Sequence, residues 1–315
     1  MMRHPAYLQY QDHTKRYFEG WYFKCISQDR HHAIALIPGM AIDPDGQRHA
    51  FIQVINAESG QTWYFDYPFE SFLAARDKLV IQVDTSLFQR EGLALDIHHP
   101  TGSVTGQLRF SQIREFPVSW HTPSIMGPFQ FVPGMECYHA VIHLSHRIDG
   151  QIHINGEVFD FDGGAGYLEK DYGRSFPQSY VWLQASHFGH GDASFIFSRA
   201  RIPWLGREFP GFFAYFTDFQ GNTARFATYN CSKLSDWQVD PDSGTCSGIL
   251  KGPAGQLKFS AQMVGGGTLR APVDGSMHRE IIESIRATVL VELTDHSGKR
   301  IYADRSTEAG MEICL

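Results

Sequence analysis

The chain has 315 residues, of which 43% are apolar and 19% charged, a balance typical of globular proteins and not of disordered ones. The 27 Lys and Arg residues against 34 Asp and Glu residues give a net charge of −7, and no basic cluster stands out, so we expect no nucleic-acid partner. Neither a signal peptide nor an apolar run of about 18 residues is present, so we expect no transmembrane segment.

Short apolar or alternating runs lie between turn signals such as Asp43–Gly46 and Asp149–Gly150, and they predict β-strands. In chain order these runs are Ala33–Ile37, Phe51–Ile55, Thr62–Phe65, Leu79–Val83, Leu93–Ile97, Val104–Phe110 and Val141–Leu144. The aromatic content of 14% and the 30 glycines also favour β-structure. The only helical periodicity of note predicts a short helix over Met277–Ile285.

The sequence also repeats itself. The run GQLRFS at Gly106–Ser111 returns as GQLKFS at Gly255–Ser260, 149 residues later. At an offset of 161 residues, Trp21 aligns with Trp182. Further pairs at this second offset are Phe51 with Phe212, Gly60 with Gly221, Thr62 with Thr223 and Phe65 with Phe226.

This repetition predicts an all-β protein made of two tandem lipocalin-like (calycin-type) antiparallel β-barrel halves that arose by internal duplication. We expect an N-terminal half over residues 1–165, a junction over 166–177 and a C-terminal half over 178–315. A barrel of about eight strands encloses one small ligand, so such a fold suits a binding cavity.

Cysteine and histidine usage argues against metal chemistry. The five cysteines are widely spaced and form no CxxC pair, so the sequence predicts neither a disulfide framework nor a zinc knuckle. This cysteine usage is typical of a protein of the reducing cytoplasm. The 16 histidines include the pairs His31–His32 and His98–His99, but none has a zinc-site spacing. Nucleophile-elbow, Walker A and dinucleotide-binding motifs are missing, so we expect no cofactor and no metal.

The first dense cluster of chemical groups is RYFEGWYFK, Arg16–Lys24, in which Glu19 sits among aromatic residues. A desolvated carboxyl group has a raised pKa and can act as a proton donor. The structural alternative is a strand in which Glu19 pairs with Arg16 or Lys24.

The second cluster, Ile125–His139, carries Glu136 and His139, which could serve as acid and base if a turn brings them together. The alternative is an ordered loop. The third cluster, Gly166–Phe188, offers Glu169 and Asp171 before a strand that carries Trp182 and Gln184 on one face. Its alternative is a salt-bridge network between domains.

These clusters carry a family resemblance. The chain resembles the tocopherol cyclase family, whose members have an FEGWYF run near the start, here Phe18–Phe23. They also have an EK-x-x-G-x-x-FP run at mid-chain, here Glu169–Pro177, and an LRAP run, here within Thr268–Val273. Asp171 and Tyr172 stand where the plant pattern has Asn and Trp, so we expect a bacterial member whose substrate need not be a tocopherol precursor.

The resemblance implies a long, apolar, prenyl-bearing ligand, such as a prenylquinol, and an enzyme that protonates an alkene in a cyclisation, isomerisation or hydration. Such a step needs a buried acid and aromatic faces that stabilise a cation. Candidate catalytic residues are Glu136, Glu169, Glu19, Asp171 and His139. Candidate ligand-binding residues are Trp21, Tyr22, Tyr172, Trp182, Gln184 and His187.

Two alternatives stay open at this point. A lipocalin-like carrier of a hydrophobic metabolite would use the same aromatic lining without chemistry. A scaffold protein that acts through its surface has no positive feature in the sequence. The sequence leaves the oligomeric state open.

Overall fold

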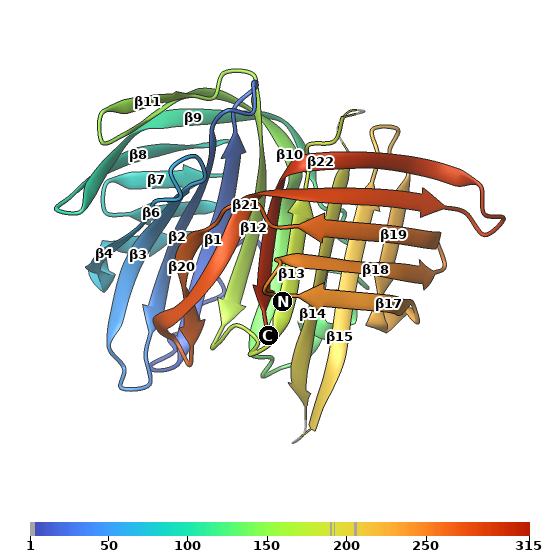
Figure 1. The fold of residues 1–315 in the computed structure, drawn as a ribbon. Helices are drawn as coiled ribbons and strands as arrows, with labels where there is room; N and C mark the ends of the chain where they lie inside the picture. Colours follow the sequence, from blue (N-terminus) through green and yellow to red (C-terminus); the bar gives the residue numbers. More distant parts are fainter. Residues whose placement is uncertain (1–3, 190, 192, 205–206) are drawn as a thin grey trace. The chain divides into compact units, whose positions relative to one another are not determined.

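The computed structural model describes residues 4–189, 191, 193–204 and 207–315, and β-strands dominate it (Figure 1). Among these residues the only helical segments are three short 3-10 turns, η1 (Phe69–Ser71), η2 (Gly127–Phe131) and η3 (Thr228–Asn230). None of them has the length and apolarity that a membrane-spanning helix needs. The prediction of an all-β fold is confirmed.

The strands of the first half of the chain are β1 (Tyr17–Ile26), β2 (Ala33–Ile42), β3 (Arg48–Asn56), β4 (Thr62–Pro68), β5 (Phe72–Ala74), β6 (Val80–Val83), β7 (Ser86–Gln89), β8 (Gly92–His99), β9 (Gly102–Glu115), β10 (Cys137–Ile154), β11 (Glu157–Asp160) and β12 (Gly164–Gly173). Those of the second half are β13 (Tyr180–Ala185), β14 (Ser194–Trp204), β15 (Arg207–Thr217), β16 (Thr223–Ala227), β17 (Lys233–Asp240), β18 (Thr245–Gly252), β19 (Gly255–Gln262), β20 (Gly267–Val273), β21 (Ser276–Thr294) and β22 (Arg300–Cys314).

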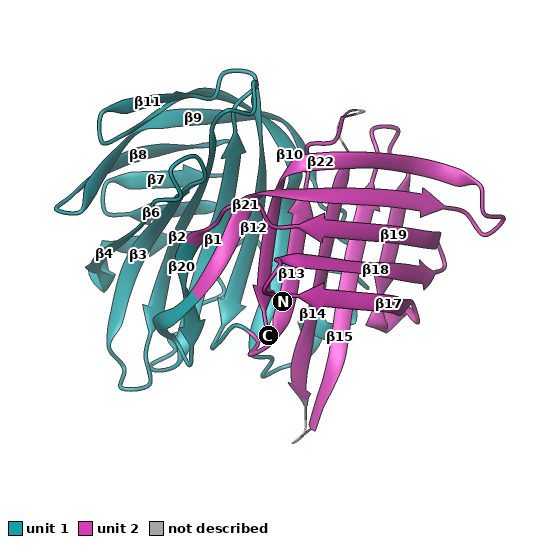
Figure 2. Ribbon diagram, in the orientation of Figure 1, with its two compact units in different colours: residues 1–176, 268–280 teal, residues 177–267, 281–315 magenta. Residues whose placement is uncertain are grey.

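The chain forms two compact units (Figure 2). Unit 1 comprises Met1–Phe176 and Thr268–Glu280, and unit 2 comprises Pro177–Gly267 and Ile281–Leu315. Each unit has its own antiparallel sheet and its own hydrophobic core. All five cysteines are free thiols.

The sheet of unit 1 has the strand order β4-β3-β2-β1-β12-β10-β9-β8-β7-β6-β5, with β11 paired to β10. Its core joins side chains from both ends of this order, such as Phe23 of β1, Ile52 of β3 and Phe88 of β7. Strand β6 contacts β2 and β3, so the sheet folds back over its own core. The pairings form an open path through the described strands, so the predicted closed barrel is not observed.

Close approach of strands in unit 1 depends on glycine. Gly39 of β2 pairs with Gly20 of β1 on one side and Phe51 of β3 on the other. A methyl group on Gly39 would lie 2.5 Å from the Phe51 ring and 2.6 Å from the Glu19 carbonyl oxygen. The ring of Phe51 therefore occupies the space that a side chain would need.

The second sheet has the order β16-β15-β14-β13-β22-β21-β19-β18-β17, with β20 paired to β21. Most of it belongs to unit 2, whereas nearly all of β20 and the start of β21 belong to unit 1. Alternate residues of β13, among them Val181 and Leu183, enter the core of unit 2. Trp182 and Gln184 lie on the opposite face of the same strand, as the alternation predicted.

The seven predicted strands are confirmed, most of them within longer strands. The predicted helix over Met277–Ile285 is wrong, because these residues lie in β21. Ile281 and Ile285 are four residues apart, which is about one helical turn and also two repeats of a strand. In the structure Ile281, Glu283 and Ile285 are buried while Ile282 is 61% exposed, which is the strand pattern.

The repeated sequences fall on strands with equivalent places in the two sheet orders. GQLRFS lies on β9 and GQLKFS lies on β19. In the first sheet β9 follows β12 and β10, and in the second sheet β19 follows β22 and β21, so the two strands hold equivalent places. Trp21 lies on β1 and Trp182 on β13, which pair with β12 and β22 respectively.

Candidate functional site

Parts of all three predicted clusters lie side by side in the sheet of unit 1. Strand β12 pairs with β1 along one edge and with β10 along the other. Tyr22 of β1 is opposite Glu169, and His139 of β10 is opposite Asp171. Antiparallel pairing thus unites the FEGWYF run, the EKDYG run and the start of β10.

Alternation along β12 divides its charged residues between two faces of the sheet. Lys170 and Tyr172 lie on the same side of the sheet as Trp21. The Lys170 ammonium group is 4.6 Å from the ring centroid of Trp21 and 5.0 Å from the ring centroid of Tyr172. Glu169 and Asp171 lie on the opposite face. Neighbouring residues of one motif therefore belong to two different clusters.

On the Trp21 side of the sheet, Glu19 and Lys170 form a buried ion pair. Their Nζ and Oε1 atoms are 2.5 Å apart, and both side chains are fully buried. Lys170 also donates hydrogen bonds to the carbonyl oxygens of Pro5 and Tyr7. The Trp21 indole donates to the carbonyl oxygen of Ala6, at 2.9 Å.

Glu19 accepts three further hydrogen bonds. The backbone amides of Gln9 and Tyr10 donate to its two oxygens at 2.7 and 2.9 Å, and the Tyr17 hydroxyl donates at 2.7 Å. Burial lowers the pKa of Lys170, an effect that the charge of Glu19 opposes, and burial together with Glu19 raises the pKa of Tyr17. The cluster therefore anchors the N-terminal segment with all of these groups hydrogen-bonded.

The expected alternative partners of Glu19 were wrong. Arg16 precedes β1, and its side chain is exposed. Lys24 lies an odd number of residues from Glu19 along β1, so the two side chains point to opposite faces of the strand. The partner is Lys170, which comes from the other family-like run.

On the opposite face of the sheet, three of the predicted catalytic residues, His139, Glu169 and Asp171, lie together. His139 Nδ1 is 2.9 Å from Asp171 Oδ1, and His139 Nε2 is 3.4 Å from Glu169 Oε2. The side chains are 12%, 19% and 6% exposed, respectively. The imidazole thus lies between two largely buried carboxyl groups.

Two further side chains support these carboxyl groups, and the sequence analysis missed both. The Tyr167 hydroxyl donates to Glu169 Oε2 at 2.5 Å, and the Cys137 thiol donates to Asp171 Oδ1 at 3.5 Å. Burial, reinforced by the nearby carboxylates, raises the pKa values of both, so they remain protonated donors. The spacing Tyr167, Glu169, Asp171 on one strand was the available signal.

Glu136 lies apart from this cluster. It precedes β10, and its carboxylate is 3.0 Å from the Arg174 guanidinium group. Tyr172, on the opposite face from Glu169, accepts a hydrogen bond from Gln130 at 2.5 Å and stacks on Tyr138 with ring centroids 4.9 Å apart.

The remaining predicted residues belong to unit 2. Trp182 is 5% exposed and Gln184 fully buried, whereas His187 follows β13 and is half-buried beside Ser186. Trp182 lies opposite Glu312 of β22.

The described residues of unit 2 also include buried glutamates that the sequence analysis missed, Glu283, Glu308 and Glu312. Glu283 and Glu312 are opposite each other across β21 and β22, and the Tyr180 hydroxyl donates to Glu312 at 2.5 Å. Alternation of Glu308 and Glu312 with apolar residues near the C-terminus was the available signal.

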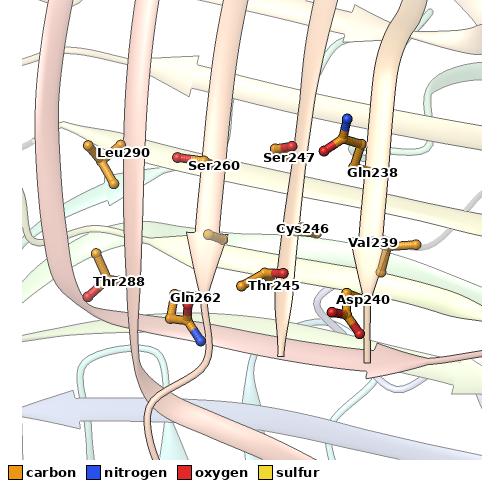
Figure 3. A pocket seen from close by; sticks show the side chains of 11 residues that line it. Gln238, Val239, Asp240, Thr245, Cys246, Ser247, Ser260, Gln262, Thr288 and Leu290 are labelled. Carbon is orange, nitrogen blue, oxygen red and sulfur yellow. The ribbon is translucent and has the colours of Figure 1, made fainter. Parts of the chain in front are cut away.

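A groove of about 470 Å³ lies on β17, β18, β19 and β21 of unit 2 (Figure 3). Polar residues such as Ser247, Ser260 and Gln262 line it together with apolar ones such as Val239 and Leu290, so its wall is polar and apolar in about equal parts. None of the predicted site residues lines this groove. It is a poor match to a long apolar ligand.

Among the described residues of unit 1, two clusters could hold a metal ion. His139, Glu169 and Asp171 each offer a donor atom, and these atoms lie within 4.8 Å of one another. The same holds for three residues at two turns, His31, His32 and Glu58. Imidazole and carboxylate donors fit zinc and related divalent ions.

Comparison with known proteins gives the family. A family model described as tocopherol cyclase-like matches residues 118–315. The chain belongs to the tocopherol cyclase-like family. No protein of curated function matches it in sequence.

Several solved structures share the fold at low sequence identity. CghA is 12% identical with a TM-score of 0.59, over 95% of this chain and 88% of CghA. A protein assigned as an AttH from Nitrosomonas europaea is 12% identical with a TM-score of 0.51, over 95% and 93% of the two chains. Kievitone hydratase from Nectria haematococca is 10% identical with a TM-score of 0.50, over 94% and 88%.

Proposed function

We propose that this tocopherol cyclase-like protein binds a hydrophobic, prenyl-bearing small molecule and catalyses protonation of an alkene, leading to cyclisation, isomerisation or hydration. The observation that carries the proposal is the His139 imidazole between the carboxyl groups of Asp171 and Glu169. The family match and two neighbours support it: CghA, whose structure was also solved with Sch210972, and a kievitone hydratase.

The cluster is suited to donate and then recover one proton. In the proposed reaction the proton moves from the cluster to the less substituted alkene carbon, and the more substituted carbon becomes a cation. A hydroxyl oxygen of the substrate, or of water, bonds to that carbon and returns a proton to the cluster. Cyclisation is then an isomerisation, hydration consumes one water molecule, and the enzyme regains its starting protonation state.

Within the cluster we assign the proton to the His139–Asp171 pair and a supporting role to Glu169. The 2.9 Å contact of His139 with Asp171 is within hydrogen-bond reach, whereas the contact with Glu169 is 3.4 Å. Glu169 already accepts a hydrogen bond from Tyr167. Glu136 ranks lower, because it lies apart from this cluster and its carboxyl group contacts Arg174 at 3.0 Å.

The ligand-binding residues stay part of the proposal. Tyr22 is opposite Glu169 and can offer an aromatic face to a developing cation. Trp182, Gln184 and His187 remain proposed ligand-binding residues within unit 2. Trp21 and Tyr172 contact the Lys170 ammonium group, so we propose that they shape the site from behind the sheet.

The test is incubation with a prenylated hydroquinone in heavy water, followed by mass spectrometry. A cyclised or hydrated product with one new carbon-bound deuterium is expected. Asp171→Asn and His139→Gln should each lower turnover by about 10²- to 10⁴-fold, the usual contribution of a general acid. Glu157→Gln, at an exposed position on β11, is the matched control and should leave turnover unchanged.

The other outcomes contradict the proposal. Recovery of unreacted quinol bound to the protein would replace it with the carrier function. Turnover that persists in both Asp171→Asn and His139→Gln would remove the cluster from the mechanism. Neither binding nor turnover would show that the ligand class is wrong.

We further propose that the two sheets are copies of one lipocalin-like unit and that the protein works in the cytoplasm. The equivalent places of β1 and β13, and of β9 and β19, support duplication. The five free thiols support a reducing compartment. Superposition of residues 17–68 on residues 180–227 in a crystal structure tests the duplication, and strands that fail to superpose would contradict it.

A further inference from the structure

We propose that His31, His32 and Glu58 form a binding site for one divalent transition-metal ion, independent of the proposed reaction. The three residues lie on two turns at one end of the unit 1 sheet. His31 and His32 are in the turn between β1 and β2, and Glu58 is in the turn between β3 and β4.

The fold holds these two turns together. The amide of Ala57, at the start of the second turn, donates to the carbonyl oxygen of Ala33 at 3.0 Å. Within the first turn, Asp29 Oδ1 accepts hydrogen bonds from the His31 amide and the Ser27 hydroxyl, at 2.9 and 2.6 Å. The donor-bearing side chains therefore project from ordered backbone.

The His32 side chain is also oriented by packing. Its ring stands edge to face against Phe159, with centroids 4.8 Å apart, and only 19% of the side chain is exposed. The Glu58 amide donates to Asn56 Oδ1 at 2.9 Å, which orders the second turn. Metal binding would therefore require little reordering of His32 or of the Glu58 backbone.

The donor atoms already have the separations found between ligands of one metal ion. His31 Nε2 is 3.1 Å from Glu58 Oε1, and His32 Nδ1 is 2.9 Å from Glu58 Oε2. Ligands about 2.0–2.2 Å from a zinc ion lie roughly 3.3–3.6 Å apart in a tetrahedron, and neighbouring ligands of a square-planar ion lie about 2.8–3.1 Å apart. Small side-chain rotations would admit the ion.

The donor set selects the class of ion. Two imidazoles and one carboxylate suit Zn²⁺, Ni²⁺ or Cu²⁺, whereas Mg²⁺ and Ca²⁺ prefer oxygen ligands alone. The His31 side chain is 62% exposed, so solvent can fill the remaining coordination positions. Histidine spacing did not predict this site, because the third ligand comes from the next hairpin.

The experiment titrates the metal-free full-length chain with Zn²⁺ by calorimetry at pH 7.5, with Ni²⁺ as second probe. One ion should bind per chain, and Zn²⁺ should raise the melting temperature. His32→Ala and Glu58→Gln should each weaken binding at least tenfold and remove the thermal shift. Binding should also weaken in acid, because imidazole binds a metal ion only when it is deprotonated.

Two control variants make the result specific. His98→Ala removes another exposed histidine, which lies 3.2 Å from Asp96, and should change nothing. His139→Gln removes the imidazole of the second possible metal cluster and should also leave affinity unchanged. The proposal is overturned if no ion binds, if Glu58→Gln and His32→Ala bind like the wild type, or if only His139→Gln loses binding. Circular dichroism confirms that each variant is folded.

Discussion

Removal of the Glu19 carboxylate should release the N-terminal segment of the chain. In Glu19→Gln the Lys170 ammonium group stays buried but loses its anionic partner, which was 2.5 Å away. The new amide NH₂ group also faces backbone donors at Gln9 or Tyr10, which the carboxylate had accepted. Breaking one partner of a buried ion pair costs about 3–5 kcal/mol.

Hydrogen exchange resolved to the Gln9 and Tyr10 amides measures this loss locally. At about 1.4 kcal/mol per factor of ten, exchange should accelerate between about a hundredfold and a few thousandfold in Glu19→Gln. Glu157→Gln, on the surface of the same unit, should leave both rates unchanged. Acceleration of less than about threefold would refute the anchoring role of Glu19.

A double-mutant cycle separates the ion pair from the other contacts of Glu19. Lys170→Met should cost less than Glu19→Gln, because the remaining carboxylate keeps three hydrogen-bond donors. The double variant removes both charges, so its cost should fall well below the sum of the two single costs. Additive costs would show that the two charges do not stabilise each other.

Three further perturbations test the packing of unit 1. Burial lowers the pKa of His143 to about 3, so between pH 6.5 and 3 the unfolded chain binds more protons than the folded one, and the free energy of unfolding decreases as the pH is lowered, by up to about 1.4 kcal/mol per pH unit. In urea unfolding, His143→Gln should flatten this pH dependence, and an unchanged slope would contradict the assignment. The side-chain amide of Gln53 makes two hydrogen bonds to the Arg270 backbone, at 3.0 and 2.9 Å. Gln53→Leu should therefore lower the free energy of unfolding by about 2–4 kcal/mol and speed proteolysis of the β20–β21 hairpin. Unchanged cleavage would count against this role. Gly39→Ala places a methyl group 2.5 Å from the Phe51 ring and should lower the free energy of unfolding, measured by thermal unfolding, by roughly 1–3 kcal/mol. Gly20→Ala should be close to neutral, because the nearest atom to its new methyl group is 3.7 Å away. Equal effects of the two variants would refute the steric argument.

Strands were predictable from the sequence because their signal is local. Runs such as Val104–Phe110 carry their alternation and bounding turns within a few residues. The helix over Met277–Ile285 was the error, since its apolar residues fit both periods over so short a run. Only the continued alternation through Thr294 separates the two.

The candidate site was predictable in its members but not in its groupings. Glu19, Glu169, Asp171 and His139 were all identified as chemically important, yet nothing local pairs Glu19 with a lysine from the other motif. That pairing follows from β1 lying next to β12, which is a property of the whole sheet. The turn-borne Glu58 escaped notice for the same reason, because its histidine neighbours come from another hairpin.

The position of each residue along β12 explains why one short motif contributes to two clusters, one that anchors the N-terminal segment and one to which we assign the proposed reaction. Lys170 turns toward the anchored N-terminal segment, while Glu169 and Asp171 turn toward His139. A deletion or replacement of the whole run would remove the anchoring contacts and the proposed catalytic groups together and could not separate their effects. Single substitutions can, because a Lys170 variant should alter hydrogen exchange at Gln9 and Tyr10, whereas an Asp171 variant should leave that exchange unchanged and alter turnover.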